Sequence, residues 1–274
     1  MTYKTLIDEG KRIIDSPDGT TEAMLLLEYV LHTDRNELLI HPEKEVENED
    51  ADTFMKLANR RASGEPVQYI IGSAPFYGLE FIVNPSVLIP RFDTEVLVEE
   101  VLKAVKEDDK ILDLCTGSGC IAVSIKKYKP GAQIYASDIS MDAIKIAKGN
   151  AEANDTDITF IHSDLLDNVG DGYDIIVSNP PYIKTAVIEG LDDIVKKHEP
   201  YIALNGGTDG LDYYRRIVAD SRTHLKQGGR LMMEIGYDQG EELKELLKEA
   251  GYSNIEIKKD LSGNDRVAMA VFGG

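Results

Sequence analysis

The segment Asp113-Leu114-Cys115-Thr116-Gly117-Ser118-Gly119 lies between a buried strand, predicted over residues 111–114, and a helix predicted over residues 121–128. Strand and helix patterns alternate from this point toward the C-terminus, which is typical of a parallel sheet with crossover helices. Near the end, residues 254–258 and 266–272 form two successive strands with only a short turn between them. We therefore expect an α/β fold whose seven-stranded sheet ends in an antiparallel strand.

The glycine-rich turn after the first strand indicates a ligand site. Glycines let a ligand approach the backbone, and the N-terminus of the following helix offers free amide donors. Asp138 ends the next predicted strand, where a carboxylate can accept both hydroxyl groups of a ribose. Asp164 and Leu165 follow the third strand, which places a carboxylate and an apolar contact for an adenine. The predicted cofactor-binding residues are Asp113, Cys115, Thr116, Gly117, Ser118, Gly119, Asp138, Asp164, Leu165 and Asn179.

A second motif, Asn179-Pro180-Pro181-Tyr182, follows the strand predicted over residues 173–177. In open α/β sheets, ligands bind beyond the carboxyl ends of the strands, where this loop and the glycine-rich turn must both lie. Because the prolines lack amide donors, the Asn179 side-chain oxygen and the Pro180 carbonyl can accept both N–H groups of a planar nitrogen. We predict catalytic roles for Asn179, Pro180 and Tyr182, with Tyr182 stacked on the substrate, and substrate contacts along the whole motif. Asp113 is expected to bond backbone amides of the glycine loop rather than act as a base.

The N-terminal part of the chain is expected to be a separate helical bundle. Apolar residues recur at helical spacing through residues 1–66. Residues 67–86 are predicted to be a β-hairpin linker, with strands at 69–71 and 76–83 on either side of a turn at 72–75. The α/β domain would then occupy residues 87–274.

Composition excludes several classes of protein. The 274 residues contain 49 acidic and 30 basic side chains, a formal charge of −19 that disfavours binding to phosphate backbones. Cys115 and Cys120 are the only cysteines, so neither a disulfide framework nor a thiolate metal site is expected. Purely apolar runs such as residues 23–27 are far too short to cross a membrane. We therefore expect a cytoplasmic protein with no metal, no membrane contact and no direct nucleic-acid partner.

The glycine-rich turn, Asp138 and the Asn179 loop resemble motifs of S-adenosylmethionine-dependent methyltransferases that alkylate nitrogen in planar groups. Further segments, over about residues 64–270, are similar to the PrmC/HemK family of release factor glutamine N5-methyltransferases; they are Gly64–Gly72, Leu88–Arg91 with Asp93–Glu95, Glu199–Pro200, Gly206–Leu211 and Glu234–Gly236. The resemblance implies a Rossmann-like fold, S-adenosyl-L-methionine as cofactor and S-adenosyl-L-homocysteine as product. It also implies methylation of the glutamine in the Gly-Gly-Gln motif of peptide chain release factors, held partly by the N-terminal domain.

Two positions depart from the family pattern, and two other functions remain open. Cys115 stands where the family has glycine, and Phe92 stands where it has proline. A DNA adenine-N6 methyltransferase would share the Asn179 loop, because adenine also presents an exocyclic amino group. A nucleotide-binding oxidoreductase or noncatalytic nucleotide-binding module would explain the glycine turn but leave that loop without a role. Arg91 and Glu95 are expected to form a packing or interdomain ion pair, and Glu234 to be structural.

Overall fold

The computed structural model describes residues 1–273. The chain forms two compact units: the first contains residues 1–73 together with residues 192–198, and the second contains residues 74–191 and the chain from residue 199 on. Among the described residues, no helix has both the length and the apolar character needed to cross a membrane.

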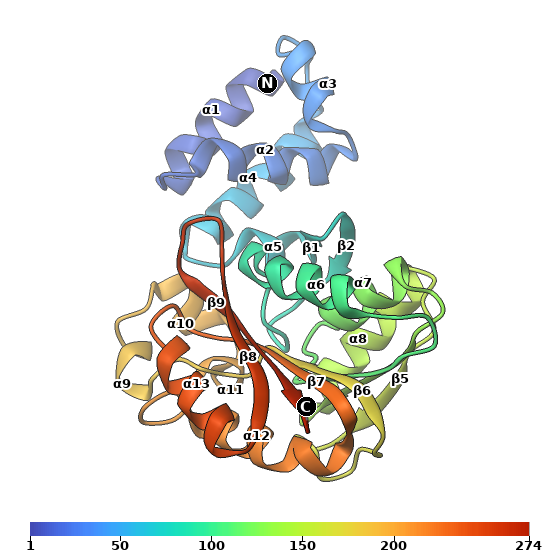
Figure 1. The fold of residues 1–274 in the computed structure, drawn as a ribbon. Helices are drawn as coiled ribbons and strands as arrows, with labels where there is room; N and C mark the ends of the chain where they lie inside the picture. Colours follow the sequence, from blue (N-terminus) through green and yellow to red (C-terminus); the bar gives the residue numbers. More distant parts are fainter. Residues whose placement is uncertain (274) are drawn as a thin grey trace. The chain divides into compact units, whose positions relative to one another are not determined.

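The first unit is helical, as predicted (Figure 1). A capping box at Thr2 starts its first helix, because the Thr2 hydroxyl accepts from the Thr5 N–H while the Thr5 side chain accepts from the Thr2 N–H. Leu26, Leu27 and Phe54 are fully buried in its apolar core. The helices are α1 (Tyr3–Ile14), α2 (Gly19–Leu31), α3 (Arg35–Ile40), α4 (Asn48–Ala62) and α5 (Val67–Ile71), joined by α10 (Asp193–His198).

The strand predicted at residues 69–71 is wrong, because α5 occupies this segment. Gly72 ends α5 in the left-handed region, at φ 80°, and its N–H donates to the Gln68 carbonyl at 2.8 Å. Val67 and Ile70 bury their side chains in the helical core. The hairpin begins only afterwards, with β1 (Ser73–Phe76) and β2 (Leu79–Ile82), so its turn is not at residues 72–75. A short apolar run has no period that separates a helix from a strand.

The second unit contains the predicted seven-stranded sheet, in the order β5-β4-β3-β6-β7-β9-β8. Its first five strands along the chain are parallel, and β9 is antiparallel to both of its neighbours, β7 and β8. The antiparallel last strand is therefore confirmed, although β8 rather than β9 forms the edge. The strands are β3 (Lys110–Leu114), β4 (Gln133–Asp138), β5 (Thr159–His162), β6 (Tyr173–Ser178), β7 (Leu225–Glu234), β8 (Tyr252–Lys259) and β9 (Asp265–Phe272).

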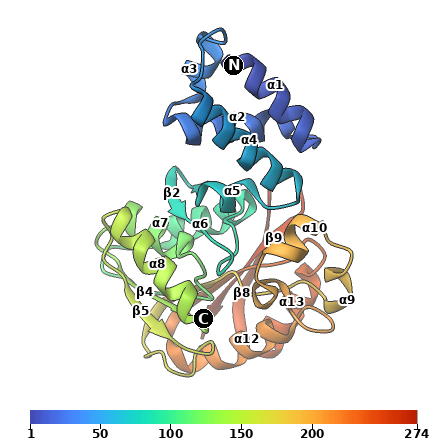
Figure 2. The ribbon, with the colours of Figure 1, turned by 180° about the vertical axis from the view of Figure 1, so that it is seen from behind.

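Helices cover both faces of this sheet (Figures 1 and 2). Successive strand residues alternate between the two apolar layers, so that Ile111 packs in one layer and Leu112 in the other. Residues of α6 (Phe92–Ala104), α7 (Cys120–Tyr128) and α8 (Met141–Ala153) line the first layer, and residues of α12 (Asp212–His224) and α13 (Gly240–Glu249) line the second. Helix α6 and the short helices α9 (Thr185–Ile188) and α11 (Tyr201–Leu204) were not predicted from the sequence.

Candidate active site

The carboxyl ends of four parallel strands bring the predicted motifs together. Leu114, at the end of β3, pairs with Ser137 of β4 and with Ser178 of β6. The Ser178 hydroxyl also donates to the Leu114 carbonyl at 2.9 Å, a buried bond that ties the two strand ends. The glycine-rich turn and the Asn179 loop therefore leave neighbouring strands at the same edge of the sheet, as the sequence analysis expected.

A pocket lies at this edge of the sheet. Nine of the predicted site residues line it: Cys115, Thr116, Gly117, Ser118, Asp138, Asp164, Leu165, Asn179 and Pro181. Asp113, Gly119, Pro180 and Tyr182 are not among the lining residues. Sequence reasoning missed several others that do line it: Leu88, Pro90, Arg91, Thr94, Ile202, Ala203, Tyr213 and Arg216. Leu88, Pro90, Arg91 and Thr94 belong to segments that carry the family resemblance, so their place in those segments could have indicated that they line the pocket.

Asp138 holds the glycine turn and faces the pocket. Its Oδ2 accepts from the Gly117 N–H and its Oδ1 from the Ser140 N–H, each at 2.9 Å. Each carboxylate oxygen keeps a further lone pair, which suits two neighbouring hydroxyl groups of a ribose. Burial raises the pKa of Asp138, while the amide donors oppose that shift by stabilising its charged form.

Asp113 is fully buried behind the turn. Its Oδ2 accepts from the Thr116 hydroxyl at 2.6 Å and from the Ala122 N–H at 3.2 Å. The predicted bonds to amides of the glycine loop are therefore corrected: the amide belongs to α7, and the loop contributes a hydroxyl. Burial raises the pKa of Asp113 to about 7, and these two donors oppose the shift. Asp113 thus acts on a ligand only through the turn that it supports.

Cys115 adopts a conformation that favours glycine. Its φ of 59° lies in the left-handed region, which costs a residue with a side chain about 1–2 kcal/mol. Burial raises the pKa of the thiol, and the charges of Asp138 and Asp113 act in the same direction, so Cys115 stays a neutral thiol. The same carboxylates favour a positively charged ligand group beside this part of the pocket.

The Asn179 loop is fixed by close backbone contacts. A Cβ added at Gly206 would lie 2.6 Å from the Cα of Tyr182, and one added at Gly210 would lie 2.4 Å from the Tyr182 carbonyl oxygen. Gln239 Nε2 also donates to that oxygen, at 3.2 Å. These contacts explain the glycines between residues 206 and 210, whose spacing the sequence analysis used only for resemblance. They restrain the loop through its backbone, in addition to the anchoring of its side chains.

The side chains of Asn179 and Tyr182 are both anchored. Asn179 Nδ2 donates to the Thr94 hydroxyl oxygen at 3.2 Å. The Tyr182 hydroxyl donates to Glu234 Oε1 at 3.2 Å, and its ring packs against the second apolar layer. Tyr182 is therefore held away from the pocket. The predicted stacking of Tyr182 on the substrate would need a ring face that is exposed to the pocket.

Arg91 and Asp164 each form an ion pair with a residue distant in the sequence. Arg91 pairs with the buried carboxylate of Glu199, whereas Glu95 Oε1 accepts from the Tyr77 N–H at 2.8 Å. The expected pairing role of Glu95 is thus wrong, because its carboxylate caps a backbone amide of the hairpin turn. Asp164 pairs with Arg216 of α12 at 3.0 Å.

Glu234 gives a test of the electrostatics behind the pocket. Burial raises the pKa of Glu234 from 4.5 to about 7, opposed by the Thr94 hydroxyl and the Arg266 charge. Because the folded-state pKa is the higher one, stabilisation from this carboxyl group is complete below about pH 4.5 and is lost as the pH rises to about 7. The difference in unfolding free energy between Glu234→Gln and the wild type should therefore shift by about 3 kcal/mol in favour of the variant when the pH is raised from 5 to 8. Urea denaturation at both pH values checks this, with exposed Glu245→Gln as control; equal shifts in the two variants would contradict it.

Comparisons with known proteins bear directly on this pocket. Residues 91–207 match the family described as Methyltransferase small domain, and residues 11–72 match the PrmC N-terminal domain. The chain is 43% identical over 260 residues to the release factor glutamine methyltransferase of Clostridium acetobutylicum, covering 92% of this chain and 91% of that protein. It is 43% identical over 284 residues to the protein of the same name from Geobacter sulfurreducens, covering 100% of both. A methyltransferase structure from Pyrococcus furiosus shares the fold, with a TM-score of 0.55, 19% identity and coverage of 73% of this chain and 91% of that chain.

Proposed function

The chain belongs to the family of release factor glutamine methyltransferases, and from this we propose that its pocket methylates the glutamine of the Gly-Gly-Gln motif in peptide chain release factors. The enzyme is an S-adenosylmethionine-dependent protein-glutamine N5-methyltransferase. One arrangement supports this assignment of roles: the register of β3 and β6 sets the glycine-rich turn, which we propose binds the nucleoside, beside the Asn179 loop, which we propose accepts the amide hydrogens.

The turn and its neighbours fit S-adenosylmethionine. Asp138 presents two carboxylate oxygens for the ribose hydroxyls, and Leu165 provides an apolar contact for the adenine. The carboxylates near Cys115 favour the positive charge of the sulfonium, which supplies the methyl group when the cofactor is bound. Ser118 and the N-terminus of α7 line the same pocket and would hold the cofactor's methionyl part.

The Asn179 loop supplies what an amide acceptor needs. An amide nitrogen is a poor nucleophile because its lone pair is delocalised into the carbonyl group. With its Nδ2 bound to Thr94, Asn179 presents Oδ1 to one N–H of the substrate. The Pro180 carbonyl stays the proposed acceptor of the other N–H, although Pro180 is not among the residues that line the pocket. These acceptors aim the nitrogen, and they strengthen as positive charge develops on it during attack. Tyr182 contributes by holding the loop through Glu234 rather than by proton transfer.

The domain assignments stay part of this proposal. Residues 1–66 would help to hold the release factor, residues 67–86 would link the parts, and residues 87–274 would carry the chemistry. A release factor substrate is consistent with a cytoplasmic site of action. No contact with nucleic acid is needed, because the acceptor nitrogen belongs to a protein.

Mass spectrometry of the substrate tests this function. Purified enzyme and S-adenosylmethionine are incubated with a release factor, with the same factor carrying alanine in place of the Gly-Gly-Gln glutamine, and with duplex DNA. We expect a single methyl group on the glutamine and none in the other two samples. Methyl transfer to DNA alone would establish the adenine-N6 alternative instead.

A further inference from the structure

A buried group of polar side chains lies directly behind Asn179. Thr94, in the first turn of α6, is 2% exposed and accepts from Asn179 Nδ2. Its hydroxyl also lies close to the carboxyl group of Glu234, at the end of β7, where it opposes the rise in pKa that burial causes. Glu234 Oε1 accepts from Tyr182, whereas Oε2 is buried with no hydrogen-bond partner among residues 1–273. One buried carboxyl group therefore connects both ends of the Asn179 loop.

The chemistry of these groups determines which end of the Asn179 carboxamide faces the pocket. An ionised carboxylate can only accept hydrogen bonds, so it commits the Thr94 hydroxyl proton to Glu234. The Thr94 oxygen can then only accept from its other neighbour, which requires the NH2 end of Asn179. The Asn179 oxygen is left for the pocket, where an acceptor for the substrate is needed. Without Glu234 and Thr94, the two ends of the carboxamide could exchange places.

We infer, on the basis of the proposed function, that Thr94 and Glu234 are positioning residues for methyl transfer. Thr94 fixes the orientation of the Asn179 carboxamide, and Glu234 fixes the direction of the Thr94 hydrogen bond and anchors Tyr182. Neither residue contacts the reacting nitrogen. Their effect is to keep the acceptor oxygen of Asn179 aimed at the amide substrate before it binds.

Charged and titratable groups from several elements lie around Glu234. Arg266 of β9 supplies a positive charge and Asp93 of α6 a negative one, while Tyr182 follows β6. Tyr214 of α12 donates from its hydroxyl to the Glu234 backbone carbonyl at 2.8 Å. Cys120 of α7 also lies close enough for the Glu234 charge to raise the pKa of its thiol, after the larger effect of burial. Of these, Arg266 favours the ionised form of Glu234, which is the form that the positioning role requires.

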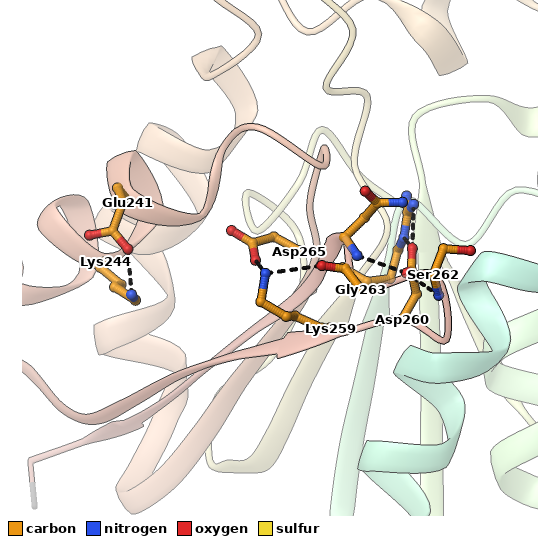
Figure 3. A network of polar contacts seen from close by, with 9 residues as sticks. Glu241, Lys244, Lys259, Asp260, Ser262, Gly263 and Asp265 are labelled. Atoms are coloured by element: carbon orange, nitrogen blue, oxygen red, sulfur yellow. Dashed lines mark hydrogen bonds and ion pairs between the residues drawn. The ribbon is translucent and has the colours of Figure 1, made fainter.

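Arg266 is itself held by the turn between β8 and β9. It lies 3.0 Å from Asp260 Oδ2 and 3.0 Å from Asp93 Oδ2. Figure 3 shows Asp260 in this turn, where its Oδ1 accepts from the Ser262 N–H at 2.9 Å. The same oxygen accepts from the Asn264 N–H at 3.0 Å. The turn therefore keeps the guanidinium group at a constant place near Glu234.

Substitution of Thr94 is the first test. Thr94→Val keeps the side-chain shape but leaves the Asn179 NH2 without its acceptor, and we expect kcat for release factor methylation to fall about 30-fold. The dissociation constant for S-adenosylmethionine should stay within about twofold, because the carboxamide orientation acts on the substrate. Thr94→Ser, which restores the hydroxyl, should recover kcat to within about threefold. In single-turnover reactions, Thr94→Val should cause no further loss in an Asn179→Ala background.

The pH profile of Glu234→Gln is the second test. A glutamine can donate to Thr94 as well as accept from it, so the direction of the hydrogen bonds is no longer imposed. We expect kcat of the wild type to rise as Glu234 ionises near pH 7, and kcat of the variant to be lower and without that rise. A purely structural role would lower thermal stability and cofactor binding together and leave the shape of the pH profile unchanged.

The outcomes separate this inference from the proposed function. Full activity of Thr94→Val, together with an inactive Asn179→Ala variant, would overturn the positioning role and leave the function intact. Equal losses for Thr94→Ser and Thr94→Val would also overturn it, since the hydroxyl would then not matter. A wild-type enzyme that leaves the release factor glutamine unmodified would overturn both.

Discussion

Asn179→Ala is expected to lower kcat for release factor methylation by about 10²–10³-fold, the loss found when one preorganised group of a transition-state site is removed. The variant loses one of the two proposed acceptors, so only the Pro180 carbonyl is left to aim the nitrogen and to stabilise the positive charge that develops on it. The loop itself should keep its conformation, because Gln239 and the close contacts at Gly206 and Gly210 hold it through the Tyr182 backbone.

The measurement for this variant is steady-state methylation at saturating S-adenosylmethionine. The thermal midpoint should change by only a few degrees, because the Asn179 side chain makes one hydrogen bond and lies partly exposed at the pocket. Asn168→Ala, at an exposed site of the same unit, is the matched control and should keep full activity. A kcat for Asn179→Ala within threefold of wild type would contradict the role given to this residue.

The features of the sheet that could be predicted from sequence are those that depend on local pattern. Strand ends followed by a glycine turn, by Asp138 and by Asn179 were recognisable because each strand is apolar and each ligand-binding group comes directly after it. The register then aligns these ends at one edge, since the carboxyl ends of parallel strands meet there. Alternation of strand and helix patterns along the chain also predicted a parallel sheet with crossover helices.

The parts that could not be predicted depend on long-range contacts. Residues 69–71 form a helix because Val67 and Ile70 reach the core of the helical unit, a contact that three adjacent apolar residues do not reveal. Thr94 and Glu234 lie 140 positions apart in the chain, and only their packing behind Asn179 supports the shared role that we infer for them. Arg91 likewise finds its partner at Glu199 rather than nearby.

Asp138→Ala is expected to raise the dissociation constant for S-adenosylmethionine about 100-fold. The variant removes the two proposed charge-assisted hydrogen bonds to the ribose, each of which contributes about 1.5–3 kcal/mol. Hydrogen bonds from the ribose hydroxyls to water in the variant recover part of that free energy. It also removes the acceptor for the N–H groups of Gly117 and Ser140, which loosens the turn. The value of kcat at saturating cofactor should change much less, because in the proposed role Asp138 contacts the ribose and not the substrate nitrogen.

Isothermal titration with S-adenosylhomocysteine and with an analogue that lacks both ribose hydroxyl groups separates these two contributions. If Asp138 binds the hydroxyls, the wild type should prefer the natural product to the analogue, and Asp138→Ala should lose most of that preference, as expected for a coupled pair. If Asp138 only supports the turn, both ligands should weaken by the same factor, and the ribose contact would be refuted. Asp142→Ala, at an exposed position on α8, should bind both ligands as wild type does. Because the hydroxyl-free analogue cannot use a carboxylate, the difference between the two ligands measures the ribose contact alone.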